Sequence, residues 1–255
     1  MIKVYCFSPT GGTRQVAQHL GDRLGALLGA EVEYHSYTLP REREELPQVE
    51  AGDVVVWATP VYAGRIPNKT LDYVRRALRA DGNPAVALVT FGNRAYDNAL
   101  AELVGLMEEG GMKPVGAAAM VTRHAFSDTL GAGRPNGEDL AALDRFATNV
   151  ATKLLTHNSK LLTVSVPGEA HPEKYYTPLK TNNAPAGSSR RNPRATARCA
   201  RVAASAWRCA RWGASVRKTV CRPSTASASN ARPAAAIARQ VPSPSPTRST
   251  SRMWL

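Results

Sequence analysis

Along the first 155 residues, apolar positions alternate between continuous runs and a helical spacing. Continuous apolar runs rich in β-branched residues are typical of strands buried on both faces of a sheet. They predict strands at 2–7, 53–59, 85–91 and 115–121, and the more polar residues 31–37 are also interpreted as a strand. Apolar residues at helical spacing predict helices at 12–28, 69–80, 98–109 and 138–155. This alternation favours an α/β fold with a doubly wound, five-stranded parallel sheet.

Charge divides the 255-residue chain near residue 180. Residues 1–180 contain 19 lysines and arginines and 20 acids, whereas residues 181–255 contain 14 basic residues and no acid. The net charge of +13 therefore comes from this last region, whose arginine, alanine, serine and proline content predicts a disordered basic tail. No apolar run approaches the roughly 20 residues that span a bilayer. We expect a cytoplasmic protein with no membrane contact.

Three loops follow predicted strands at their carboxyl ends, where doubly wound sheets bind ligands. The first loop contains Ser8, Thr10, Gly11, Gly12 and Thr13. Its hydroxyls and backbone N–H groups at the start of a helix suit an anion. It has no lysine or arginine and lacks the ending of a nucleoside-triphosphate loop. We expect a phosphomonoester held mainly by hydroxyls and backbone, with a simple glycine turn as the alternative.

The other two loops offer an aromatic face and polar edges. The second loop is made of Thr59, Pro60, Val61, Tyr62, Ala63 and Gly64. The ring of Tyr62 can stack on a planar ligand, although a lone tyrosine is more often a surface residue that covers the core. In the third loop, Gly92 permits close backbone approach, while Asn93 and Tyr96 provide polar groups. Each loop is weak alone, but together they predict one ligand site.

These motifs resemble those of the flavodoxins. Ser8-x-Thr10-Gly11-x-Thr13, together with the loops at 59–64 and 91–96, carries the resemblance over residues 1–158. It implies FMN as cofactor, with residues 8–13 around the ribityl phosphate and Tyr62 facing the isoalloxazine ring. Gly92, Asn93 and Tyr96 would border the other side of that ring. Arg94 stands where an acidic residue is common, which favours a module with a fused redox partner over a free shuttle.

Residues 159–180 resemble the connector of the ferrodoxin family, in which a flavodoxin-like domain precedes a ferredoxin with two [4Fe–4S] clusters. Such a ferredoxin needs two C-x2-C-x2-C-x3-C runs. Residues 181–255 contain only Cys199, Cys209 and Cys221. Their spacing fits neither a cluster motif, a zinc site nor a disulfide framework. We therefore expect no metal site in this chain.

Alanines in this region have the spacing that the missing cysteines require. Ala200, Ala203, Ala206 and Ala210 are separated by 3, 3 and 4 residues, and Ala228, Ala231, Ala234 and Ala238 repeat these separations. In a shifted frame, an alanine codon preceded by T supplies the cysteine codon TGC. We interpret residues 181–255 as a low-complexity, out-of-frame tail in place of a ferredoxin domain, with the frame change near 181–184. Only the product in the other frame would carry clusters.

The predicted function is electron transfer through FMN, to or from a fused two-cluster ferredoxin, with redox proteins as partners and no catalytic residue. Three alternatives stay open: an FMN-dependent quinone or nitro reductase, a module that binds no flavin, and a basic tail that binds nucleic acid without specificity. The five histidines are scattered, and His124 is the one expected nearest the ligand. Cys6 is expected to be a buried apolar residue. The pattern does not indicate an oligomeric state.

Overall fold

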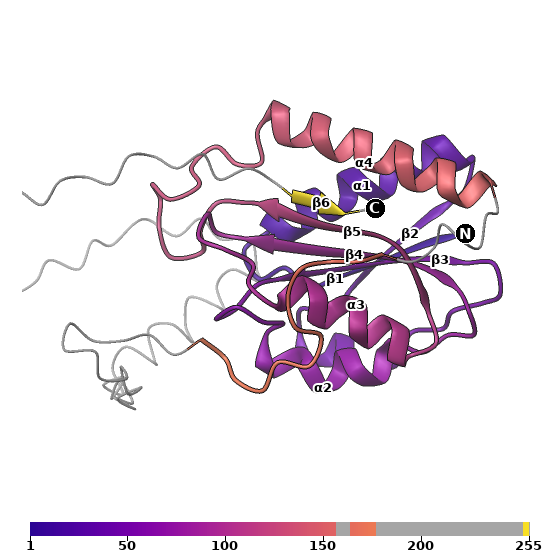
Figure 1. Ribbon diagram of the computed structural model, residues 1–255, viewed down its shortest axis with the longest axis horizontal. Helices are drawn as coiled ribbons and strands as arrows, with labels where there is room; N and C mark the ends of the chain where they lie inside the picture. Colours follow the sequence, from indigo (N-terminus) through magenta and orange to yellow (C-terminus); the bar gives the residue numbers. More distant parts are fainter. Residues whose placement is uncertain (157–163, 177–251, 255) are drawn as a thin grey trace, which may run out of the picture. The chain divides into compact units, whose positions relative to one another are not determined.

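The computed structural model describes residues 1–156, 164–176 and 252–254. Strands and helices alternate along the first range (Figure 1). In chain order they are β1 (Ile2–Cys6), α1 (Gly12–Leu28), β2 (Val32–Ser36), the 3-10 helix η1 (Pro40–Arg43), β3 (Val54–Pro60), α2 (Asn68–Ala77), β4 (Pro84–Phe91), α3 (Ala99–Glu109), β5 (Lys113–Val121) and α4 (Gly137–Thr156). Every strand and helix predicted from the apolar pattern is present, with ends shifted by a few residues.

The five strands β1 to β5 form a parallel sheet in the order β2-β1-β3-β4-β5. This order is the flavodoxin-like arrangement of a doubly wound sheet, so the predicted fold class is confirmed. The chain first steps from β1 to β2 on one side and then returns to β3 on the other side of β1. The loops after β1 and β3 therefore diverge, and this switch point opens a crevice at the carboxyl ends of the strands.

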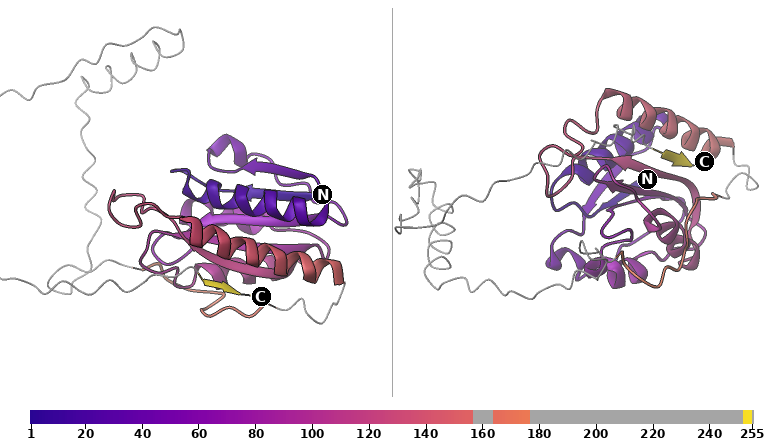
Figure 2. Two further views of the ribbon diagram at one scale, coloured as in Figure 1. Left: turned by 90° about the horizontal axis from the view of Figure 1, so that it is seen from above. Right: turned by 60° about the vertical axis from the view of Figure 1, so that its left-hand side comes forward.

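Helices cover both faces of the sheet (Figure 1). Helices α1 and α4 lie side by side over one face, as the view from above in Figure 2 shows, and they are linked by a 2.8 Å hydrogen bond between His19 Nε2 and Asp144 Oδ1. Val16, Leu20 and Leu24 recur every four residues on α1 and are fully buried against the sheet. Helical spacing thus selects one apolar face, as the sequence predicted.

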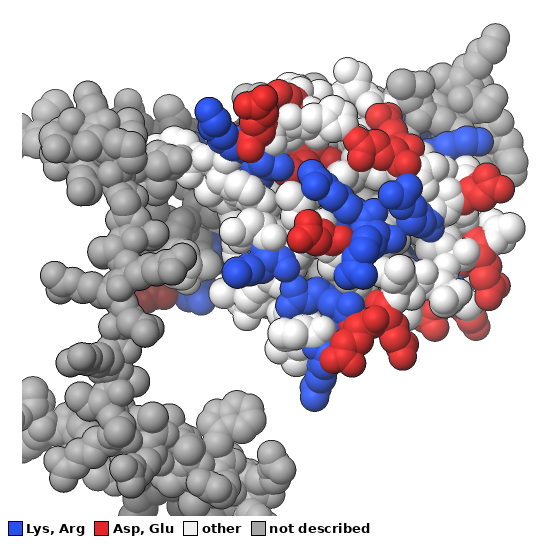
Figure 3. Space-filling view, turned by 90° about the horizontal axis from the view of Figure 1, so that it is seen from below, with Lys and Arg blue, Asp and Glu red and all other residues white. Residues whose placement is uncertain are grey.

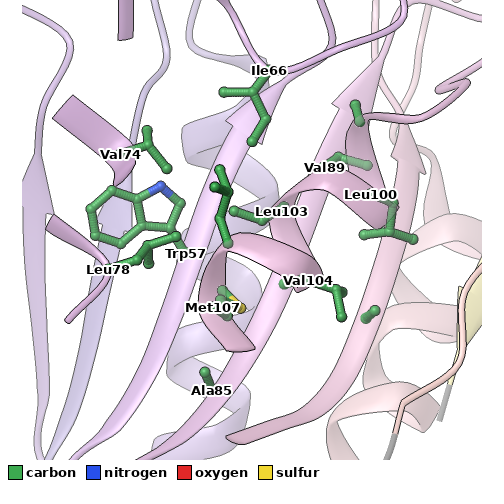
Figure 4. Packing of buried hydrophobic residues seen from close by; sticks show 14 of the residues in the cluster. Trp57, Ile66, Val74, Leu78, Ala85, Val89, Leu100, Leu103, Val104 and Met107 are labelled. Atoms are coloured by element: carbon green, nitrogen blue, oxygen red, sulfur yellow. The ribbon is translucent and has the colours of Figure 1, made fainter. Parts of the chain in front are cut away.

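The opposite face carries the larger core cluster, under α2 and α3 (Figure 4). Trp57 of β3 is completely buried there, and the rings of Tyr5, Tyr37 and Tyr73 lie 4.9–6.4 Å from it between centroids. Leu103 and other aliphatic residues of α3 close the cluster from the side of β4. This packing fixes β3 and β4, whose carboxyl ends carry two of the predicted loops.

Helix α2 ends earlier than predicted, at Ala77 instead of residue 80. The next amides bond elsewhere: the N–H of Ala80 donates to Gly110 O and that of Gly82 donates to Gly111 O. A Cβ on Gly110 would lie 1.6 Å from Leu78 O, so only glycine allows this contact. Tertiary hydrogen bonds to the end of α3 therefore replace the last helical turn.

The predicted tail contains one element that the sequence analysis missed. Arg252–Trp254 form β6, which pairs antiparallel with β5 at the sheet edge, so the prediction of a disordered tail is wrong for these three residues. The open edge of β5 offers unpaired backbone groups to an added strand. The cysteines and alanines behind the frame-change interpretation lie outside the described residues, as do the remaining parts of the tail.

Part of the predicted connector packs on the domain. Within residues 159–180 the structure describes 164–176, where Val164 is buried in the core cluster beneath α3. Across the described ranges, no helix combines the length and apolarity that a membrane crossing requires. Nor do three or more His, Cys, Asp or Glu residues gather there as a metal site would need. Cys6 is buried as predicted, and burial raises the pKa of its thiol to about 12.

Candidate functional site

Two neighbouring cavities open where the loops after β1, β3, β4 and β5 meet. The Tyr62 cavity, about 370 Å³, is lined by Pro9, Thr10, Thr13, Pro60, Val61, Tyr62, Ala63, Thr90, Phe91, Gly92, Thr122, Arg123, His124, Ala125 and Phe126. The Gly11 cavity, about 240 Å³, is lined by Thr10, Gly11, Gly12, Gln15, Arg123, His124, Ala125, Gly133 and Arg134. Four residues line both cavities, so they form one continuous crevice at the switch point.

The loop after β1 directs backbone N–H groups toward the Gly11 cavity. Gly11 is the N-cap of α1 with a left-handed φ of 90°, and the first turn of the helix contains no acid. The first amides of a helix have no intrahelical acceptor. Among the described contacts, Ser8 Oγ satisfies the amide of Arg14 at 3.0 Å, but no acceptor is recorded for the amides of Gly12 and Thr13. These amides and the helix dipole favour an anion.

Two predicted residues of this loop have internal partners. Ser8 lines a separate cavity with Arg14, and its backbone N–H donates to Thr38 Oγ1 at 2.9 Å. Thr13 Oγ1 and Thr90 Oγ1 lie 2.8 Å apart in a buried hydrogen bond. This bond joins the start of α1 to the end of β4 beneath the Tyr62 cavity. Thr10, Gly11 and Gly12 remain as the residues of the loop that line the Gly11 cavity.

The second loop is a tight hairpin that presents Tyr62. The N–H of Tyr62 donates to Arg65 O at 2.9 Å, and the N–H of Arg65 donates to Tyr62 O at 3.1 Å. Ala63 and Gly64 between them both have positive φ, 50° and 81°, as a two-residue hairpin turn requires. The side chain of Tyr62 is 41% exposed at the cavity, with Phe7 edge-on to its ring. The hairpin therefore leaves an aromatic ring accessible to a ligand.

A buried ion pair holds this hairpin from below. Glu102 of α3 accepts hydrogen bonds from Arg65 Nε at 3.3 Å and from the backbone N–H of Ile66 at 3.1 Å. The side chains are only 2% and 8% exposed, for Glu102 and Arg65 respectively. The hydrogen bond with this carboxylate raises the pKa of Arg65 above its ordinary value. The pair is thus the main polar anchor of the hairpin.

The third loop lies mostly beside the crevice. Gly92 lines the Tyr62 cavity, and a Cβ there would lie 2.6 Å from His124 Cδ2, so a side chain at this position would displace the loop after β5. Asn93 and Tyr96 do not line either cavity. The ring of Tyr96 instead packs edge-on against Phe91, with centroids 5.6 Å apart. Asn93 and Tyr96 were predicted to border the ligand ring, but neither residue lines a cavity of the crevice.

A fourth loop, after β5, completes the crevice and was largely missed by sequence reasoning. It contributes Arg123, His124 and Phe126 to the Tyr62 cavity and Arg134 to the Gly11 cavity. Phe126 is 95% exposed, an unusual state for a large apolar side chain. His124 was singled out from its position after the last strand. The neighbours of His124 could have been predicted in the same way, because every loop that follows a strand at this sheet edge can reach the crevice.

Two arginines, both ion-paired, line the Gly11 end of the crevice. No aspartate or glutamate lines either cavity within the described residues. Arg134 pairs with Asp139, and this hydrogen-bonded partner raises the pKa of Arg134. Arg123 pairs with Asp128, which is 96% exposed and so screened by water. The loop at 8–13 has no basic residue of its own, but two arginines from the loop after β5 also line the Gly11 cavity, and phosphate binding there stays a prediction.

The structure brings together nine of the predicted binding residues and leaves five outside the cavities. Those that line the crevice are Thr10, Gly11, Gly12, Thr13, Pro60, Val61, Tyr62, Ala63 and Gly92. Ser8, Thr59, Gly64, Asn93 and Tyr96 do not. Thr59 is fully buried at the end of β3, and Gly64 packs against Asp97, with its Cβ position 2.8 Å from Asp97 Oδ2. The binding role of all these residues stays a prediction.

Comparisons with known proteins add structural likeness only. No protein-family model and no curated protein matches the chain. Among solved structures, an archaeal flavodoxin is 17% identical, with 60% of this chain and 97% of that chain covered and a TM-score of 0.42. The flavodoxin of Megasphaera elsdenii is 15% identical over 60% of this chain and 99% of its own, with a TM-score of 0.42. The assignment of the flavodoxin-like fold to this chain follows from its strand order.

Proposed function

We propose that residues 1–176 form an FMN-binding module that carries electrons between redox proteins. The observation that supports this most directly is the crevice itself. At one end, free helix amides and two arginines surround a small cavity, and at the other end an exposed tyrosine faces a larger one. An anion attached to a flat aromatic system matches that arrangement.

The residues fit such a ligand in size and chemistry. Cavities that hold small cofactors are typically some 300–1,000 Å³ and mostly apolar, with few polar groups. Gly12 permits close approach of the loop to Thr122, since a Cβ on Gly12 would lie 3.3 Å from Thr122 Cβ. The backbone amides of Gly12 and Thr13 would bind the phosphate, and Tyr62 would pack on the isoalloxazine ring.

The chain's own groups would bind and orient the cofactor and supply no covalent chemistry. FMN, when bound, provides the electron-accepting and electron-donating chemistry. Burial raises the pKa of Tyr62, so its hydroxyl stays neutral at physiological pH. Phe126 and Tyr62 at the open mouth leave the ring edge accessible to a partner protein. Lys69, Arg75 and Arg76 are exposed on α2. Lysines and arginines are interspersed with acids on the face seen from below (Figure 3).

The proposed electron partner is a two-cluster ferredoxin joined through residues 159–180, in the cytoplasm. The support is the resemblance of the connector and the alanine spacing in residues 181–255. An independent determination of the gene from codon 175 to the stop codon tests this part alone. One base gained or lost near codons 181–184 would restore the cysteine runs. An unchanged frame would remove iron–sulfur chemistry from the proposal without affecting the FMN module.

Reconstitution of the purified protein with FMN tests the main proposal. We expect quenching of flavin fluorescence at 1:1 stoichiometry, and Tyr62→Ala should weaken binding about tenfold, because ring stacking of this kind contributes roughly 0.5–1.5 kcal/mol beyond the buried area. Tyr34→Ala is the matched control, since Tyr34 is 42% exposed but lies outside both cavities. A wild-type protein that binds no FMN would disprove the proposal.

The same preparation separates electron carriage from enzymatic reduction. The open mouth beside Phe126, whose side chain is 95% exposed, is also what a quinone or nitro reductase would need. We expect the FMN-loaded protein to exchange electrons with redox proteins and to show no steady NADPH oxidation with a quinone. Sustained NADPH oxidation without a partner protein would favour the reductase.

A further inference from the structure

The segment 164–176 runs beside α3 and ends at the crevice; it is the orange stretch in Figure 1. Two glycines allow its close approach to the domain. A Cβ on Gly105, in the middle of α3, would lie 2.9 Å from Ala170 Cβ, and Gly168 approaches Ala101 with a φ of 121°. Glycine within a helix costs about 1 kcal/mol relative to alanine. Its use at Gly105 is explained by the segment that packs over it.

The segment satisfies two acceptors of the hairpin that presents Tyr62. The Tyr175 hydroxyl donates to Ile66 O at 2.8 Å, and the backbone N–H of Tyr176 donates to Ala63 O at 2.8 Å. The Arg65 guanidinium also lies over the Tyr175 ring, 4.5 Å from its centroid. Arg65 is therefore held between Glu102 below it and an aromatic face beside it.

The segment contacts the third loop as well. The Arg94 guanidinium lies 4.9 Å from the centroid of the Tyr176 ring. At the other end of that loop, Asn98 Oδ1 accepts a hydrogen bond from the backbone N–H of Glu169 at 3.2 Å. The hairpin and this loop also meet directly, because the N–H of Asn98 donates to Gly64 O at 3.0 Å. One short stretch thus contacts both the Tyr62 hairpin and the third loop, of which Phe91 and Gly92 line the Tyr62 cavity.

We propose that residues 164–176 act as a strap that fixes the two ring-side loops, with Tyr175 and Tyr176 as positioning residues for the flavin ring. This inference rests on the proposed function. Neither tyrosine lines the cavities, so each acts through the hairpin: Tyr175 through Ile66, and Tyr176 through Ala63. Tyr176 at the end of the described segment thus lies next to Ala63.

Two single substitutions in the full chain remove one strap hydrogen bond each. Tyr175→Phe deletes the hydroxyl and keeps the ring, and Tyr176→Pro deletes the amide donor. Each should weaken binding of FMN and of riboflavin by the same factor, roughly three- to tenfold, since one hydrogen bond is lost and the phosphate loop is untouched. In the flavin-free protein, the amides of Tyr62 and Arg65 should exchange hydrogen at least about threefold faster.

Matched controls isolate the strap contacts. Tyr34→Phe removes a tyrosine hydroxyl that contacts Asp22 Oδ1 and Gln18 O and lines neither cavity of the crevice, and Tyr176→Ala keeps the amide donor that Tyr176→Pro lacks. Hairpin exchange and flavin binding unchanged in both Tyr175→Phe and Tyr176→Pro would overturn the strap. A wild type without FMN binding would overturn the proposed function instead, and the exchange measurement would still test the strap.

Discussion

Glu102→Gln should lower the free energy of unfolding by about 3–5 kcal/mol, because it leaves the buried Arg65 guanidinium without its counter-charge. The carboxylate of Glu102 also accepts a hydrogen bond from the backbone N–H of Ile66. The side chains of Arg65 and Glu102 are both almost inaccessible to water. An isosteric amide keeps the shape of the side chain but not the charge. Urea denaturation of the flavin-free protein, followed by circular dichroism, measures the change.

Glu109→Gln is the control, with the same chemical change two turns further along α3. Glu109 is half exposed and its ion pair with His171 spans 3.2 Å, so its loss should cost less than about 1 kcal/mol. The double variant Arg65→Met with Glu102→Leu should recover part of the loss, since apolar pairs often replace buried ion pairs. Equal destabilisation by Glu102→Gln and Glu109→Gln would mean that burial adds nothing to this pair.

The fold was predictable because its parallel strands, except β2 at the edge, are almost continuously apolar. Val54–Trp57 and Ala85–Val89 contain no polar residue, and a parallel sheet covered on both faces selects for such runs. Helical spacing located the four helices for the same reason, since each packs one face on the sheet. The predicted end of α2 was wrong. The helix ends at Ala77 because hydrogen bonds to Gly110 and Gly111 replace its last turn. Such long-range partners leave no local pattern.

Residues that follow the ends of strands could be predicted from the sequence to line the crevice. Residues whose place depends on tertiary packing could not. Gly11 and Tyr62 line the crevice, as expected of residues that follow strands at the switch point, and their binding roles stay predictions. Tyr96 is an aromatic residue of the kind that contacts a flavin ring, but its ring packs against Phe91 and not in the cavity. Arg134 lies more than 120 residues along the chain from Gly11 and belongs to no motif, so only the fold reveals that it lines the Gly11 cavity. The contacts of residues 164–176 with the hairpin could not be predicted either, because they too join residues far apart in the sequence.

Gly12→Asp should weaken FMN binding by about a thousandfold, while the flavin-free protein should be at least as stable as the Gly12→Asn variant, which makes the same contact with Thr122. An aspartate in the first turn of α1 interacts favourably with the helix dipole, by about 0.3–1 kcal/mol, and no other acid is present in that turn. The same carboxylate would repel a phosphate bound at the amides of Gly12 and Thr13. Like charges about 4 Å apart near a protein surface repel by roughly 4 kcal/mol, about a thousandfold in dissociation constant.

Gly12→Asn isolates the charge, because it has the same size and makes the same close contact with Thr122. We expect FMN to bind Gly12→Asp at least about a hundredfold more weakly than Gly12→Asn, and riboflavin, which has no phosphate, to bind the two variants equally. Fluorescence titration of each flavin gives the dissociation constants, and thermal unfolding gives the stability. If FMN and riboflavin were weakened alike, the anion would not be bound at the start of α1, and the phosphate end of the proposed site would have to lie elsewhere.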